Sequence, residues 1–145
     1  MRIKLNKLSA LFIPAMLITA CGSSDDSSKN AEVCQTFEAK VTDSGLTTLL
    51  SGFVENWEFL EGSLEGAEAA WELGAVMETL GIAAETASSM ASGEAKDLFA
   101  DLSISLADAG TYVALKGGSV DSVLLSNFDQ VLGDFDAISN LCGES

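Results

Sequence analysis

Apolar residues recur every three or four positions from residue 31 onward, and no proline interrupts them, because the single proline of this 145-residue sequence is Pro14. That spacing lines apolar side chains along one face of a helix. No segment alternates apolar and polar residues between turn signals, as a strand would. The pattern predicts an all-α domain over residues 31–145, a length suited to one domain with a single core.

Turn signals divide this region into four predicted helices. They run from Asn30 as N-cap to about Leu60, from about Ser63 to Ala91, from Ser92 as N-cap to Lys116, and from Ser119 as N-cap to Cys142. Connections of two or three residues make successive helices antiparallel. We therefore expect an up-down-up-down antiparallel four-helix bundle. The apolar spacing slips between Val41 and Leu46, at Asp43-Ser44-Gly45, which indicates either a kink or a full break.

The predicted second helix carries a stripe of mostly small residues beside its apolar seam. The stripe consists of Gly66, Ala70, Gly74, Met77, Gly81, Ala84 and Ser88. Glycine inside a helix costs about 1 kcal/mol relative to alanine. Three glycines on one stripe therefore predict that another helix packs unusually close to this one.

The N-terminal residues have the features of an export signal. Arg2, Lys4 and Lys7 precede an uncharged stretch, Leu8–Ala20, which is thirteen residues long. A membrane-spanning helix needs about 20 apolar residues, so this length fits a signal peptide instead. The stretch ends in Ile18-Thr19-Ala20-Cys21, which resembles the lipobox of bacterial lipoproteins.

The lipobox resemblance implies that Cys21 receives a diacylglycerol group and that the chain is cut before it. The protein is then anchored to the outer face of the cell membrane through this lipid. The alternative is an ordinary secretory signal with an incidental cysteine. Residues 1–20 are thus a predicted signal peptide, and Gly22–Asn30 (GSSDDSSKN) a predicted flexible polar linker.

Once Cys21 carries lipid, two cysteines remain, Cys34 and Cys142. An even pair in an extracytoplasmic protein predicts a disulfide; two unpaired buried cysteines are the alternative. The disulfide also supports four helices, because only an even number of antiparallel helices brings these cysteines to the same end of the bundle.

Charge excludes one class of partner. All 22 acidic residues follow Cys21 and three of the seven basic residues precede it, so cleavage leaves a net charge of about −18. A domain this acidic is repelled by phosphate backbones, and we expect no nucleic-acid partner. For the same reason we do not expect it to lie flat on an anionic membrane surface.

Residues that carry catalytic chemistry are scarce. The chain has no histidine, which removes Ser-His-Asp triads, His-ligated metals and histidine general bases. Acidic pairs such as Asp97 with Asp101, and Glu61 with Glu65, share a helix face, and we interpret them as solvated surface rather than a weak divalent-cation site. We therefore predict no enzymatic activity, no cofactor, and no catalytic or metal-binding residue.

Trp57, Trp71 and Tyr112 either pack in the core or line an apolar ligand cavity, and Trp57 favours packing because it continues the seam of the first helix. Beyond the lipobox, the helical body with a cysteine at each end resembles small lipid-anchored helical proteins of actinobacteria, a likeness that implies no activity. We expect a binding or envelope-structural module with an unidentified protein partner. The alternative is a carrier of a small apolar ligand inside the bundle.

Overall fold

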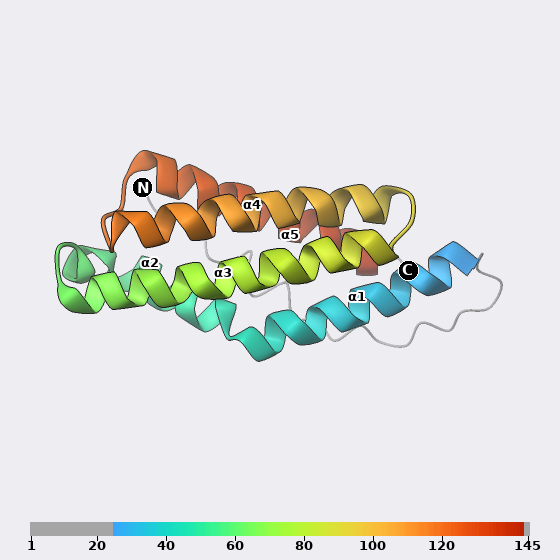
Figure 1. Cartoon of the computed structure of the whole chain (residues 1–145), viewed down its shortest axis with the longest axis horizontal. Coiled ribbons are helices and arrows are strands. Elements are labelled where there is room, and N and C mark those ends of the chain that lie inside the picture. Colours follow the sequence, from blue (N-terminus) through green and yellow to red (C-terminus); the bar gives the residue numbers. More distant parts are fainter. Residues whose placement is uncertain (1–24, 144–145) are drawn as a thin grey trace.

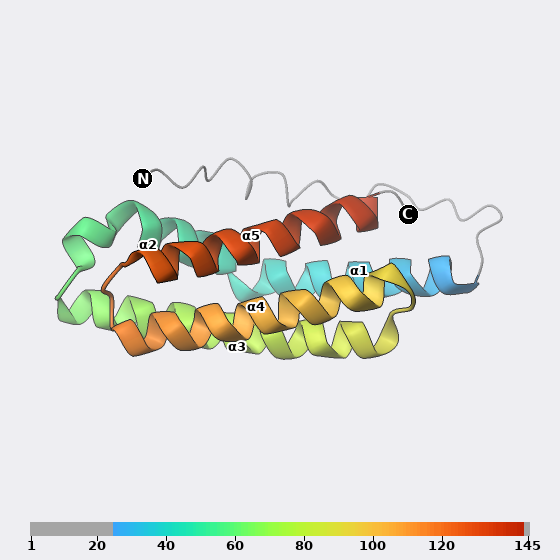
Figure 2. The same cartoon turned by 90° about the horizontal axis from the view of Figure 1, so that it is seen from above.

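The computed structural model describes residues 25–143, and within that range the chain is all-helical, with no strand. The helices are α1 (Asp25–Ser44), α2 (Leu46–Leu60), α3 (Leu64–Met90), α4 (Glu94–Lys116) and α5 (Ser122–Gly143). They lie side by side along one axis (Figure 1), and α3 with α4 forms a layer against which α1, α2 and α5 pack (Figure 2). The all-α prediction is confirmed.

Five helices are present where the sequence predicted four, because the first predicted helix is broken at Gly45. This residue has φ 69°, a left-handed conformation that glycine adopts without steric cost. The Ser44 hydroxyl donates a hydrogen bond to the carbonyl of Val41 at 2.6 Å and accepts one from the Leu46 amide at 3.2 Å. These bonds end one helix and start the next, so the irregular spacing at Asp43–Gly45 marks a full break.

Helix α1 also begins earlier than predicted. Residues 25–30 are helical, although they fall in the polar stretch predicted to be a flexible linker. Asp26 lies in the first turn of the helix, where negative charge is favourable. Asn30, the predicted N-cap, instead lies inside α1 and is bonded to another part of the molecule. The predicted signal peptide, Cys21 and residues 22–24 of the predicted linker lie outside the described residues.

The other helix ends follow the sequence signals closely. Ser63 caps α3 by accepting a hydrogen bond from the Gly66 amide at 2.9 Å. Helix α4 ends at Lys116, and Gly117 follows in the left-handed conformation. Helix α5 differs, because it starts after Asp121 rather than after Ser119: the Asp121 carboxylate accepts a hydrogen bond from the Leu124 amide at 2.9 Å.

Gly74 and Gly81 of the small-residue stripe lie against α4, whereas Gly66 lies against Leu60 at the end of α2, so the prediction of a close neighbouring helix is confirmed for α4. A Cβ atom placed on Gly74 would lie 2.7 Å from the carbonyl oxygen of Gly110, and one placed on Gly110 would lie 2.9 Å from the carbonyl oxygen of Gly74. The Ser103 hydroxyl donates to the carbonyl of Gly81 at 2.9 Å across the same seam. Every member of the stripe is buried, whereas several members of the apolar seam beside it are only half-buried.

The core between the layers is filled by large side chains. Phe99 of α4 packs edge-on against Phe37 of α1, with ring centroids 5.2 Å apart, and Phe135 of α5 stacks on the other side of Phe37 at 6.2 Å. Nearer the opposite end, Phe53 of α2 meets Phe128 of α5 edge-on at 6.2 Å. These contacts tie α1, α2 and α5 to one hydrophobic core.

Of the helices described, α4 alone is long and apolar enough to cross a membrane by length and composition, with a mean hydropathy of 1.3 over its best window. Leu102, Leu106 and Val113 of this helix are fully buried, whereas Ile104 and Leu115 are exposed. The packing of α4 in this core therefore explains part of its apolar character, since 39% of that window is buried.

Candidate functional site

The disulfide lies at one end of the molecule. Cys34 of α1 and Cys142 of α5 are bonded, with Cα atoms 5.8 Å apart. Both are buried. The predicted pairing is confirmed, and it joins the end of the chain to α1 across a sequence separation of 108 residues.

A second link at this end fixes the start of α1 to the turn between α3 and α4. The side-chain amide of Asn30 donates to the carbonyl of Ser92 at 3.1 Å, and its oxygen accepts from the Ser92 amide at 2.9 Å. Both residues were predicted N-caps. Instead, these two residues form hydrogen bonds with each other although 62 positions separate them in sequence. Rules for local helix capping do not predict such a pairing.

An open depression of about 350 Å³ lies beside this link. It is lined by Asp26, Ser27, Asn30, Ser92, Gly93, Glu94 and Leu141. Most of these residues are polar, so the depression does not resemble the apolar cavity that a carrier of an apolar ligand requires. Two carboxylates on its rim make it acidic, in keeping with the rest of the surface.

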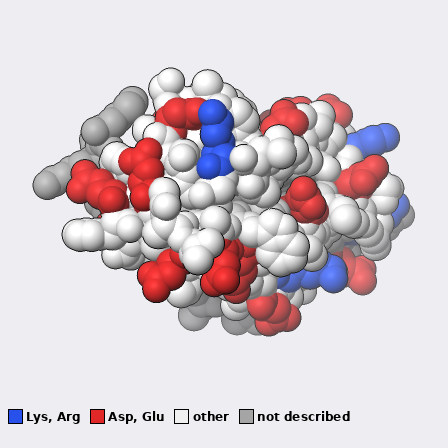
Figure 3. Space-filling model, turned by 60° about the vertical axis from the view of Figure 1, so that its left-hand side comes forward, with Lys and Arg blue, Asp and Glu red and all other residues white. Residues whose placement is uncertain are grey.

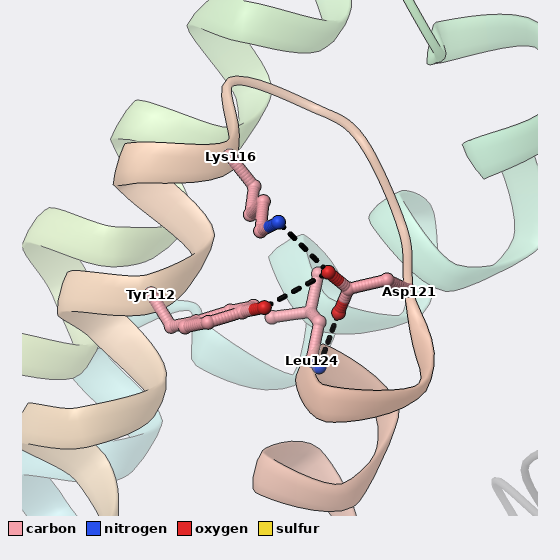
Figure 4. Close-up of polar contacts among 4 residues, drawn as sticks. All are labelled: Tyr112, Lys116, Asp121 and Leu124. Carbon is pink, nitrogen blue, oxygen red and sulfur yellow. Dashed lines mark hydrogen bonds and ion pairs between the residues drawn. The ribbon is translucent and has the colours of Figure 1, made fainter.

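A polar cluster joins α4 to α5 at the opposite end (Figure 4). Asp121 accepts a hydrogen bond from the Tyr112 hydroxyl at 2.8 Å and forms an ion pair with Lys116 at 2.9 Å. The hydrogen bond from the Leu124 amide, followed by those from Lys116 and Tyr112, lowers the pKa of Asp121 from 3.8 to about 2. The cluster holds the α4–α5 connection together, and this is the role of Tyr112.

The two tryptophans occupy different environments. Trp57 of α2 is half-buried. Its place on the apolar seam of the first predicted helix indicated packing in the core, and the structure agrees in part. Trp71 of α3 is 70% exposed, so it neither packs in the core nor lines an interior cavity. Neither interpretation of the sequence anticipated an exposed tryptophan, because the helical period alone does not say which faces of a helix meet a neighbour.

The acidic pairs lie on the surface. Asp97, Asp101, Glu61 and Glu65 are all exposed. Among residues 25–143, no group of three or more Asp, Glu or Cys side chains is placed to hold a metal ion. Figure 3 shows carboxylates scattered over one side of the molecule, with lysines sparse among them.

The outer face of the α3–α4 layer is the other distinctive surface. No described helix covers this face (Figures 1 and 2). Large apolar side chains project from it rather than packing inside: Trp71, Ile82, Ile104 and Leu115. Exposed apolar side chains gathered on one uncovered face can mark an interaction site, so this face is the best candidate for an interaction surface.

No protein-family model, curated protein or solved structure matches this chain. Its function must therefore be inferred from its own residues.

Proposed function

We propose that the protein is a bacterial lipoprotein, held at the outer face of the cell membrane by lipid on Cys21, with its helical body acting as a binding or envelope-structural module. The observation that carries this proposal is the sequence Ile18-Thr19-Ala20-Cys21 directly after a thirteen-residue apolar stretch. The likeness of the body to small lipid-anchored helical proteins of actinobacteria belongs to the same proposal.

The disulfide supports export, because structural disulfides persist in oxidising compartments outside the cytoplasm. The position where α1 begins also indicates how the domain is oriented relative to the membrane. Asp25 is four residues after Cys21, and four residues reach at most about 14 Å. The end of the molecule that carries the disulfide and the α3–α4 turn would then face the membrane, with the Tyr112 cluster at the far end.

We also infer that α1 and α2 serve as one broken arm, so that five helices make four antiparallel arms. Both pack against α3, and α2 continues roughly along the direction of α1 (Figure 1). The disulfide supports this inference, since an even number of arms returns Cys142 to the end where Cys34 lies.

A binding or structural module fits the interior better than a carrier of a small apolar ligand. The aromatic rings that could have lined a cavity pack against each other, as Phe37 does with Phe99 and Phe135. Trp71, one of the candidates for lining a cavity, lies on the surface. These contacts support recognition through the outer surface of the bundle.

Mass spectrometry of the protein recovered from the cell envelope tests the anchor. We expect an N-terminal Cys21 carrying a diacylglycerol group, and we expect Cys21→Ser to accumulate as an uncleaved precursor. The replacement Cys34→Ser is the matched control, since it removes a different thiol and should leave lipidation unchanged. An unlipidated mature N-terminus in the wild type would refute the proposal.

A further inference from the structure

We propose that the outer face of α3 and α4 is a docking surface for a basic amphipathic helix of a partner protein. This inference rests on the proposed role as a binding module and names the face and the partner chemistry. Four exposed apolar side chains on this face carry the first part of the argument: Trp71 is 70% exposed, Ile82 67%, Ile104 61% and Leu115 81%.

The contacts between the helices set the positions of these side chains along the layer. Gly74 opposes Gly110, and a Cβ placed on Gly81 would lie 3.3 Å from the carbonyl oxygen of Ser103. With this antiparallel register, Trp71 and Leu115 fall at one level, and Ile82 and Ile104 fall at another. Eleven residues separate the two levels on each helix, which is about 16 Å along the axis. The face therefore offers two apolar contacts three turns apart.

Carboxylates occupy the positions between and beyond these apolar contacts. They are Glu78 and Glu85 of α3 and Asp101 and Asp108 of α4, all exposed. The Glu78 side chain crosses the seam, since its Cγ would lie 3.3 Å from a Cβ on Gly110. Within the described part of the chain, no lysine forms an ion pair with any of these four residues.

This charge pattern selects the partner. A second copy of the chain would bring carboxylates against carboxylates, and an anionic membrane surface would be repelled in the same way. A partner with Lys or Arg around an apolar centre is complementary. The exposed apolar residues recur with helical spacing, so a partner helix lying along α3 and α4 could contact them. Amphipathic helices are commonly recognised by apolar surfaces in this way.

The spacing on α3 defines the complementary helix. Counted from Trp71, Glu78 is 7 residues on, Ile82 is 11 and Glu85 is 14. Positions i, i+7, i+11 and i+14 share one face of a helix. A partner helix parallel to α3 therefore needs apolar residues at i and i+11 and Lys or Arg at i+7 and i+14.

A synthetic helical peptide with Leu at i and i+11 and Lys at i+7 and i+14 tests this pattern. The full chain is titrated with the peptide while tryptophan emission and calorimetric heat are recorded. We expect saturable binding that weakens with salt and shifts the emission of Trp71 to shorter wavelength. A Trp57→Phe background isolates the Trp71 signal.

Two sets of changes locate the contact. Glu78→Lys with Glu85→Lys, and separately Ile82→Ser with Ile104→Ser, should each weaken binding at least about tenfold, a loss of roughly 1.4 kcal/mol. The matched control is Phe59→Ser, since this side chain is 85% exposed but belongs to α2. The control should bind like the wild type.

Changing the peptide instead of the protein avoids any effect of substitutions on the folding of the protein. Replacing its two Lys residues with Glu should abolish binding to the unaltered protein. The proposal is overturned by equal binding of both peptides, by equal loss in the control variant, or by no binding. It is also overturned if the face instead forms dimers in sedimentation or binds anionic vesicles. Lipidation of Cys21 is measured separately, so either proposal can fail alone.

Discussion

Where α3 passes α4, the backbones approach so closely that Gly74 and Gly110 leave no room for a Cβ atom. Where α1 meets α5, the helices contact one another sparsely, and a disulfide joins them. The α3–α4 pair is held by close backbone contact at Gly74, Gly81 and Gly110, and the α1–α5 pair by a disulfide and the stacked rings of Phe37 and Phe135. One bundle can thus combine a tightly packed half with a half that depends on a cross-link.

Removing the disulfide should have the largest effect. In Cys34→Ser with Cys142→Ser, the unfolded chain regains the entropy of a loop of 108 residues, which lowers the unfolding free energy by about 4 kcal/mol. Helical content at low temperature should not change, since the bond acts mainly on the unfolded ensemble. Denaturant unfolding followed by circular dichroism measures both.

Hydrogen exchange in the same variant sharpens the comparison. Amides of α1 and α5 should lose protection from exchange before those of α3 and α4, because only α1 and α5 are joined by the disulfide. Equal loss of protection in all helices would show that the two halves are not distinct.

Gly74→Ala tests the tightly packed half. Alanine should gain up to about 1 kcal/mol from helix propensity, but its methyl group meets the Gly110 carbonyl, and overpacking costs about 1–3 kcal/mol. We therefore expect net destabilisation. Gly133→Ala in α5 is the matched control, since nothing lies within 4 Å of a Cβ there. It should be neutral or stabilising in thermal unfolding, and a stabilised Gly74→Ala would contradict the close approach.

Asn30→Ala tests the link between α1 and the α3–α4 turn. The substitution removes two hydrogen bonds and leaves the backbone of Ser92 without these partners, which should cost about 1–2 kcal/mol. Asn56→Ala removes only an exposed bond to the carbonyl of Gly52 within α2 and should change stability far less. Urea unfolding of the two variants distinguishes them, and similar losses would argue against the link.

Acid pH should produce the smallest effect. The pKa of Asp121 is lowered to about 2, so its charge stabilises the folded state above pH 3.8 and this contribution is lost as the pH falls toward 2. Asp121→Asn retains an N-cap side chain but removes the charge. The melting temperature of the wild type should therefore fall more between pH 4 and pH 2 than that of the variant. Parallel curves would exclude a role for this carboxylate.

The ionisation of Glu38 affects stability in the opposite direction to that of Asp121. Partial burial raises the pKa of Glu38 on α1, so this residue favours the folded state at low pH and less so as the pH rises through its pKa. Because Glu38 is present in both proteins, the difference between wild type and Asp121→Asn still reports on Asp121.

The helical class, the bounds of α3, the end of α4 and the close approach of α3 to a neighbour were predictable from local patterns. The start of α4 was predicted wrongly, because Gly93 rather than Ser92 precedes the helix. The spacing of apolar residues, the serine before Leu64 and the glycine after Lys116 each act on residues close in sequence. Their effects can therefore be predicted from the sequence alone. The pairing of Cys34 with Cys142 was also predictable, since these are the two cysteines that remain once Cys21 is assigned to the lipid.

Only the tertiary structure decided which helix faces remain exposed and where polar side chains find distant partners. Asn30 and Ser92 looked like caps, yet they bond to each other because folding brings the start of α1 to the α3–α4 turn. Trp71 fits the helical period equally well as core or surface, and its exposure depends on which side of α3 the other helices cover. Local signals act along the chain, whereas burial and long-range bonds depend on how complete helices assemble.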